Sequence, residues 1–163
     1  MAERLHEGET IYRGIPVSAG VCRGKILVLD QVHNPVPSRQ LSDSEIPAEI
    51  QRLEKALVQT RHQLNEVQRQ ITESVGAEQA SIFDAHLLVL EDPALIEESI
   101  KVIRTRKINA EQAFQTVAER YAAALAKVED EYLRERAGDM RDVTSRVLHQ
   151  MMGRNDDVDL RHL

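Results

Sequence analysis

The chain has 163 residues, which suits one domain of ordinary size that buries a core without disulfide or metal staples. Its formal net charge of −6 argues against a general nucleic-acid binder, and an aromatic content of 3% with no Trp leaves no platform for base stacking. Cys22 is the only cysteine, so an intrachain disulfide and a thiolate metal cluster are excluded, which fits a cytoplasmic protein.

The N-terminal part is polar at first and then rich in glycine. Residues 1–10 are expected to form a disordered leader, and they lack the apolar run of a signal peptide. Between residues 11 and 30, glycines punctuate β-branched and apolar residues, which predicts two short strands at roughly 12–17 and 21–29. Residues 31–42 include Pro35 and Pro37 and are expected to be a linker. Because two strands cannot bury themselves, residues 11–42 are predicted to be a small β appendage.

The sequence from residue 43 onward has the periodicity of amphipathic helices. A first helix is expected to begin near Pro47, with Asp43 or Ser44 as its N-cap, and to end at Gly76. Its apolar positions recur every three to seven residues and form one seam, made of Ile46, Ile50, Leu53, Leu57, Leu64, Val67 and Ile71. The seam predicts a long helix with one side packed on a core.

Further helices are predicted over the rest of the chain. They span residues 78–91, 93–106 behind the N-cap Asp92, 110–128 behind a capping box of Asn109 and Gln112, and 131–152 before Gly153. Short turns between helices favour antiparallel neighbours. We therefore expect a mainly α fold, an antiparallel bundle of four to five helices over residues 43–153, with no membrane-spanning segment. Residues 154–163 would follow it as a return segment.

Catalytic and metal-binding motifs give no prediction. A di-iron site in a bundle needs Glu-x-x-His motifs on two facing helices, and no histidine inside a predicted helix has a Glu three residues before it. The glycines between residues 14 and 24 form neither of the common phosphate-binding motifs, so they are interpreted as turns. His86 lies among apolar residues, where a lone histidine is usually a packed residue.

Residues 77–100 are unusual in charge. They contain six acids and no Lys or Arg, together with more apolar residues than one core-facing stripe needs. One interpretation is an exposed apolar patch framed by acids, which would suit a basic partner. The other is a central helix that is buried on all sides, and the pattern alone does not separate the two. A second charged segment, residues 130–142, can form a solvated ladder of ion pairs, although Gly138 costs about 1 kcal/mol inside a helix.

Three stretches, in this order and spacing, carry a resemblance to a known family. They are G-I-P-V-S-A-G-V-C-R-G-K (residues 14–25), A-S-I-F-D-A-H-L-L-V-L-E-D-P-A-L (80–95) and D-E-Y-L-R-E-R-A-G-D-M-R-D (130–142). The chain resembles the N-terminal region of Enzyme I, the phosphoenolpyruvate–protein phosphotransferases of the bacterial sugar phosphotransferase system. In that family a helical subdomain, inserted into an α/β subdomain, docks the phosphocarrier protein HPr.

The resemblance implies a set of residues that bind HPr. Matched motif by motif, they are Glu78, Ser81, Ile82, His86, Val89, Leu95, Leu133 and Arg136. The apolar members would fill the centre of the contact while Glu78 attracts basic residues of HPr. The sequence departs from the family at Gln79, a position that is often basic, and at Pro93-Ala94, which replace an acidic pair. These departures predict that the affinity for HPr or the choice of partner differs from that of the best-known members of the family.

The family's phosphorylated histidine lies in a G-G-x-T-S-H-T type motif, which this sequence does not contain. The resemblance implies no catalytic residue and no cofactor in this chain, which we expect to be inactive alone. The parent enzyme, a homodimer in the family, would use phosphoenolpyruvate and Mg²⁺ through other domains. The alternatives are a nitrogen-branch Enzyme I, a subunit of a dihydroxyacetone kinase, or a structural oligomerisation bundle.

Overall fold

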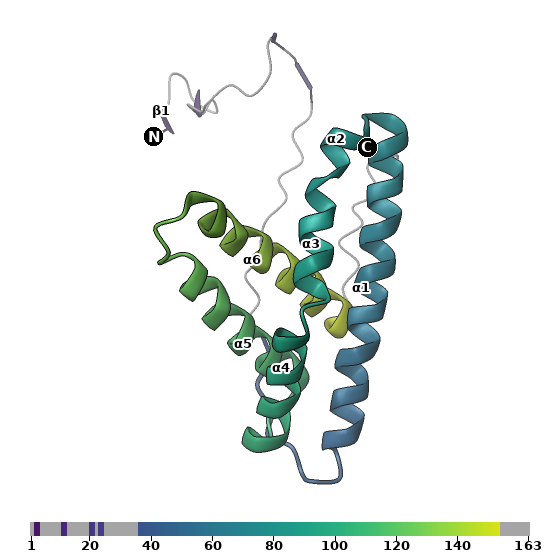
Figure 1. The fold of residues 1–163 in the computed structure, drawn as a ribbon, viewed down its shortest axis with the longest axis vertical. Coiled ribbons are helices and arrows are strands. Elements are labelled where there is room, and N and C mark those ends of the chain that lie inside the picture. Colours follow the sequence, from purple (N-terminus) through teal and green to yellow (C-terminus); the bar gives the residue numbers. More distant parts are fainter. Residues whose placement is uncertain (1, 4–10, 13–19, 22, 25–35, 154–163) are drawn as a thin grey trace. The chain divides into compact units, whose positions relative to one another are not determined.

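The computed structural model describes residues 2–3, 11–12, 20–21, 23–24 and 36–153, and its chain divides into two compact units, residues 1–34 and 35–163 (Figure 1). In the first unit, β1 (Ala2–Glu3) pairs with β2 (Ile11–Tyr12) in antiparallel orientation. β1 lies in the stretch expected to be a disordered leader. The sequence does not predict this pairing, because a ladder of two residues is made by backbone groups and leaves no periodic signal. The predicted strands at 12–17 and 21–29 lie mostly outside the described residues, as does the return segment at 154–163.

The second unit is a bundle of helices. They are α1 (Ile46–Ser74), α2 (Ala77–Ala80), α3 (Ile82–Leu90), α4 (Pro93–Arg106), α5 (Ala110–Leu125) and α6 (Glu131–Met152). The long helix α1 packs against each of the other five, and α5 packs against both α4 and α6 (Figure 1). The predicted mainly α bundle is confirmed. No helix in the described part of the chain is long and apolar enough to span a membrane.

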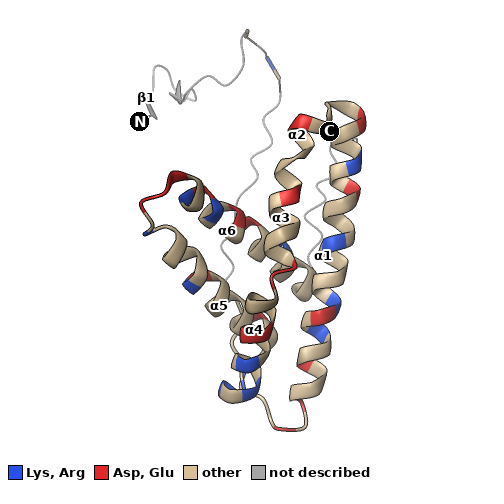
Figure 2. Ribbon diagram, in the orientation of Figure 1, with Lys and Arg blue, Asp and Glu red and all other residues tan. Residues whose placement is uncertain are grey.

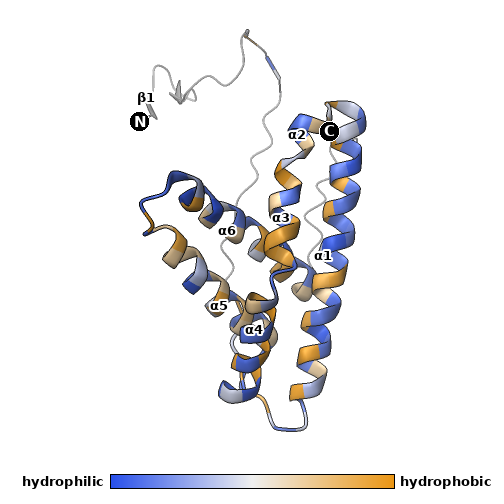
Figure 3. Cartoon of the chain, in the orientation of Figure 1, coloured by the Kyte–Doolittle hydropathy of each residue, from blue (hydrophilic) through white to orange (hydrophobic). Residues whose placement is uncertain are grey.

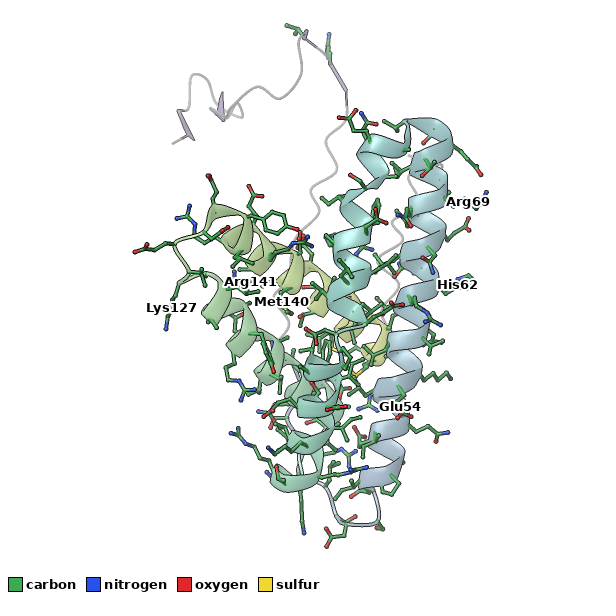
Figure 4. All side chains as sticks on the ribbon, viewed as in Figure 1. Glu54, His62, Arg69, Lys127, Met140 and Arg141 are labelled. Atoms are coloured by element: carbon green, nitrogen blue, oxygen red, sulfur yellow. The ribbon has the colours of Figure 1, made fainter. Side chains whose placement is uncertain are left out.

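The core of the bundle is drawn from all its long helices. Its largest fully buried side chains include Leu53 and Leu64 of α1, Ile103 of α4, Phe114 of α5 and Val143 of α6. The opposite side of α1 is polar, and Glu54, His62 and Arg69 project outward from it (Figure 4). The two sides of α1 thus follow the amphipathic seam that the sequence predicts.

Helix ends follow local signals at some positions and distant contacts at others. Asp92 caps α4 by accepting a hydrogen bond from the Ala94 amide at 2.8 Å, as predicted, and Gly153 ends α6 with φ at +64°. The predicted caps of α1 are wrong. Glu45 occupies that position, and its carboxylate accepts from the amide and hydroxyl of Ser42 at 2.8 and 2.7 Å.

The predicted capping box at α5 is also wrong. Asn109 stands at the N-cap position, but its side chain does not cap the helix. It accepts from the Arg39 amide at 2.9 Å and donates to the Pro37 carbonyl at 2.8 Å. Gln40 and Ile108 form an antiparallel bridge beside these bonds, flanked by hydrogen bonds from the Leu41 amide to the Lys107 carbonyl and from the Asn109 amide to the Arg39 carbonyl. The segment before α1 is therefore fastened to the turn between α4 and α5.

The helix predicted over residues 78–91 is broken in two. Ser81 separates α2 from α3, and both its amide and its hydroxyl bond to the carbonyl of Glu78, at 3.3 and 2.7 Å. A serine hydroxyl competes in this way with the regular helical pattern of hydrogen bonds. The break gives α3 a direction of its own.

An ionic network lies at the base of the bundle, where α1 meets α5. Arg52 donates to both oxygens of Glu111 at 2.6 Å and to Glu49 at 2.7 Å, and Glu49 also accepts from the Ala110 amide at 2.9 Å. Burial by itself raises the pKa of the Glu111 carboxyl, but hydrogen bonds from Arg52 and Asn109 outweigh it and hold that pKa below its ordinary value. We call Glu49, Arg52, Asn109 and Glu111 the basal network.

Candidate functional site

Helix α3 exposes apolar side chains on its outer side. Ile82 is 53% exposed and Leu88 is 67% exposed, while Val89 is half-buried. Ile82 and Val89 stand seven residues apart, so they share one face of the helix, and Leu88 points about 100° away from Val89 around the helix axis. Figure 3 shows how densely hydrophobic α3 is. We call Ile82, Leu88 and Val89 the α3 ridge.

The inner side of α3 packs between α1 and α6. Leu90 is buried in the core and Phe83 and Leu87 pack against it. The interpretation of a helix buried on all sides is therefore wrong for α3, because one side is buried and the other carries exposed apolar residues. The helical period of a continuous apolar run cannot tell these sides apart, because every direction carries an apolar residue.

Acidic residues lie before, within and after α3 (Figure 2). Glu78 of α2 is exposed and precedes the ridge by one turn. Asp84 accepts a hydrogen bond from Gln68 of α1 at 2.7 Å, and Glu91 pairs with Arg61 of α1 at 3.4 Å. The ridge is thus an apolar strip with carboxylates at its ends and along one edge.

Helix α6 contributes a second set of side chains beside α3. Leu133 is half-buried, and the guanidinium of Arg136 lies over the ring of Tyr132, 4.8 Å from its centroid, while also donating to the Tyr132 hydroxyl. The Arg136 Nη1 atom lies 3.8 Å from Oδ2 of Asp139. Arg136 is therefore held against α6 by a stacked ring and by a carboxylate.

His86 links the two helices. It is 6% exposed, and its ring lies edge-on to Phe83 with the ring centroids 5.8 Å apart. Its Nε2 atom is 3.5 Å from Oδ1 of Asp139. Neither ring nitrogen has a hydrogen-bond partner within the described part of the chain. We call His86, Asp139 and Arg136 the α3–α6 cluster.

Most of the residues predicted to bind a partner lie on α2, α3 and the first half of α6. Glu78, Ser81 and Ile82 are exposed, and Val89, Leu133 and Arg136 are half-buried; His86 is buried at the junction. Leu95 is a correction, because it is 1% exposed in the core and has no surface to offer a partner. Three neighbours were missed: Leu88, Tyr132 and Asp139. Tyr132 and Asp139 stand four residues before and three residues after Arg136, a spacing that places them beside it on a helix, but the segment was interpreted only as a solvated ladder of ion pairs.

The described residues include an open hollow of about 350 Å³, lined by Glu97, Ile100, Lys101, Arg104 and Thr105, which all come from α4. Within the same residues, no group of three or more His, Cys, Asp or Glu side chains could hold a metal ion.

The family model of the N-terminal region of PEP-utilising enzymes matches residues 13–136. The chain belongs to this family. It is 36% identical to the phosphoenolpyruvate–protein phosphotransferase of Haemophilus influenzae over 140 residues, which are 86% of this chain and 24% of that one. The enzyme of Bacillus subtilis is 35% identical over 141 residues, with the same two shares. The chain thus spans about a quarter of the length of these relatives.

Solved structures agree with this assignment. The solution structure of an Enzyme I protein matches 73% of this chain and 48% of its own, with a TM-score of 0.70 at 34% identity. The N-terminal domain of a nitrogen Enzyme I matches 72% of this chain and 49% of its own, with a TM-score of 0.64 at 30% identity. The resemblance stated from three sequence stretches is confirmed, and relatives from both branches share the fold.

Proposed function

We propose that this chain is the part of a phosphoenolpyruvate–protein phosphotransferase that docks the phosphocarrier HPr. The observation that carries the proposal is the α3 ridge, an exposed apolar strip bordered by carboxylates, in a chain whose relatives are phosphotransferases. Exposed apolar strips with a polar border are typical of surfaces that bind another protein. The parent enzyme would pass phosphate from its phosphohistidine to the docked HPr in the cytoplasm.

The proposed contact has an apolar centre and a charged rim. Ile82 and Val89 of α3, with Leu133 of α6, would pack on an apolar patch of HPr. Glu78 would attract basic residues at the edge of that patch, and Arg136 would meet an acidic or phosphorylated group. Ser81 and His86 complete the proposed set. Phosphoenolpyruvate and Mg²⁺ would be bound by other parts of the parent enzyme, a homodimer.

The test is a titration of the ¹⁵N-labelled chain with unlabelled HPr. We expect chemical-shift changes centred on residues 78–89 and on the first half of α6, and a lower affinity at high salt because exposed charges are screened. Ile82→Ala should weaken binding about tenfold, since a central apolar contact is commonly worth more than 1 kcal/mol. The matched control is Val58→Ala, which shortens an exposed valine on α1.

Two outcomes would contradict the proposal. One is the absence of any shift change at low salt. The other is a tight self-association in sedimentation experiments that Ile82→Ala abolishes, which would favour an oligomerisation bundle instead. Equal losses in Ile82→Ala and Val58→Ala would place the contact away from the α3 ridge.

A further inference from the structure

We infer that Tyr132 is a positioning residue for the proposed docking: it holds the guanidinium of Arg136 in place and leaves most of its N–H donors free for an acidic group of the partner. The inference rests on the proposed function and adds a residue to the same site. Tyr132 stands in the first turn of α6 and Arg136 follows four residues later, so their side chains are neighbours on one side of the helix.

The contact between the two side chains uses mainly the face of the guanidinium. The Cζ atom of Arg136 lies 4.8 Å from the centroid of the Tyr132 ring, and Nη2 donates a hydrogen bond to the Tyr132 hydroxyl. An arginine over an aromatic ring is held by attraction to the ring and by stacking, which consume no N–H donor. Within the described residues, the bond to Tyr132 is the only hydrogen bond that the guanidinium makes, so most of its donors remain available.

A second arginine of α6 shows the contrasting arrangement. Arg141 donates to both oxygens of Glu119, at 2.9 and 3.2 Å, so a carboxylate takes up its donors and offsets its charge. Arg136 also approaches a carboxylate, but its Nη1 atom lies 3.8 Å from Oδ2 of Asp139, which is too long for a hydrogen bond. Asp139 attracts Arg136 without taking a donor, and the neutral ring of Tyr132 makes the closer contact.

A held arginine with free donors suits the recognition of an acidic group. A carboxylate or a phosphate accepts parallel N–H bonds from one guanidinium, and this geometry requires the guanidinium plane to be fixed. An arginine that is fixed before binding avoids the entropy cost of being immobilised by the partner. The Arg136 side chain is 22% exposed, so it is both held and reachable.

Removal of the ring should weaken docking through Arg136. Immobilising one free side chain of this length lowers affinity by about two- to tenfold, so we expect a loss of that size in Tyr132→Leu. Tyr132→Phe keeps a ring under the guanidinium and removes only the hydroxyl. It should therefore retain most of the affinity, and a loss in Tyr132→Phe as large as that in Tyr132→Leu would show that the ring does not hold Arg136.

The experiment is a double-mutant cycle, measured by titration of the chain with HPr. Arg136→Met removes the charge and the donors but keeps a long side chain, so in this background Tyr132→Leu should cause little further loss. A loss as large as in the wild-type background would show that Tyr132 contacts the partner directly, and would overturn the inference.

The chain contains a matched control for the ring. On α5, the guanidinium of Arg120 lies over the ring of Tyr121, 5.5 Å from its centroid, and neither residue belongs to the proposed contact. Tyr121→Leu should therefore leave the affinity for HPr unchanged. An equal loss in Tyr121→Leu and Tyr132→Leu would trace the effect to the bundle as a whole and overturn the inference.

Two forms of HPr identify the acidic group that Arg136 meets. A loss in Tyr132→Leu with unphosphorylated HPr identifies a carboxylate of the partner. A loss only with phosphorylated HPr identifies its phosphate. If the affinity for both forms stays unchanged, the inference is wrong.

A further measurement needs no partner. The ¹⁵N relaxation of the Arg136 Nε–Hε group in the free chain reports how firmly the guanidinium is held. Its order parameter should fall in Tyr132→Leu and stay close to the wild-type value in Tyr132→Phe. An order parameter that Tyr132→Leu leaves unchanged would overturn the inference. If HPr fails to bind the wild-type chain, the proposed function fails, while the relaxation of Arg136 still decides whether Tyr132 holds it.

Discussion

The basal network and the α3–α6 cluster bury polar groups to a similar depth but differ in how many hydrogen bonds those groups make. Glu49 and Glu111 are 6% and 4% exposed, and His86 is 6% exposed. Each basal carboxylate accepts several hydrogen bonds of 2.6 to 3.0 Å, from Arg52, from Asn109, from Arg39 and from a backbone amide. Within the described residues, the only polar contact of the His86 ring nitrogens is the long one to Asp139. The ring nitrogens of His86 therefore remain without hydrogen bonds in the described residues, whereas the basal carboxylates accept several.

This difference suggests that the basal network stabilises the bundle, whereas the α3–α6 cluster belongs to the surface proposed to bind a partner. A buried carboxylate with all its bonds made holds helices together, and removing its partner exposes the full cost of burying a charge. Burying the His86 ring nitrogens costs desolvation free energy that no hydrogen bond in the described residues offsets. His86 lies under the surface proposed to meet a partner. Three substitutions test the comparison.

The largest effect is expected from Arg52→Ala. It removes the guanidinium shared by Glu49 and Glu111 and leaves two buried carboxylates without their main counter-charge. We expect the free energy of unfolding, measured in urea, to fall by about 3 kcal/mol. Arg61→Ala breaks the exposed pair with Glu91 and should cost less than about 1 kcal/mol. Similar losses in the two variants would show that the basal network does not stabilise the bundle more than a surface pair does.

A smaller effect of the opposite sign is expected from His86→Leu. The substitution replaces ring nitrogens that lack hydrogen bonds with apolar atoms of similar volume, so the free energy of unfolding should stay unchanged or rise by about 1 kcal/mol. Thr60→Val is the matched control, because the Thr60 hydroxyl is also buried and without a hydrogen-bond partner in the described residues. A loss above about 2 kcal/mol in His86→Leu alone would mean that His86 is a structural residue like those of the basal network.

The smallest effect is expected from Glu45→Gln, on the thermal stability of the chain at low pH. Hydrogen bonds from the Ser42 hydroxyl and amide, and then from Arg39, lower the pKa of Glu45 to about 2. Because this pKa lies below the ordinary value of about 4.3 in an unfolded chain, the carboxylate stabilises the fold above that value. The contribution is lost as the pH falls toward 2. Glu45→Gln should therefore flatten the decline of thermal stability between about pH 4.5 and about pH 2.5.

The control for Glu45→Gln is Glu54→Gln on the outer side of α1 (Figure 4). It should leave the pH profile of the melting temperature as it is in the wild type. If both variants change the profile equally, the acid response belongs to the net charge of the chain. The bonds around Ser42 and Glu45 would then have no part in it.

The sequence predicted the helices well because their signals are local. The seam of α1, the cap at Asp92 and the stop at Gly153 depend on neighbouring residues, and all three are found in the structure. Asn109 failed as a capping residue because its partners, Arg39 and Pro37, are about seventy residues away in sequence. Leu95 was expected at the surface from the family motif, but it is buried in the core, because a motif match does not show which side of a helix faces the core. Contacts between distant residues leave no periodic trace.

The same limit applies to charge. Glu49, Arg52 and Glu111 look like solvated helix residues in the sequence, yet they form the most densely hydrogen-bonded part of the bundle. Likewise, Arg136 was expected from the family motif, whereas the contact of Asp139 with His86 on another helix became visible only in three dimensions. The family motifs predict which residues bind a partner, and the packing of the helices determines which side chains contact those residues.

The bridge between residues 39–41 and the turn after α4 has a mechanical meaning. The segment leading into the bundle is fastened there by two backbone hydrogen bonds, at 2.7 and 3.1 Å, and by both ends of the Asn109 amide. The Arg39 side chain also pairs with Glu45, just before α1, and with Glu49 of α1. A pull on residue 36 would therefore load the turn between α4 and α5 and the first turn of α1 together.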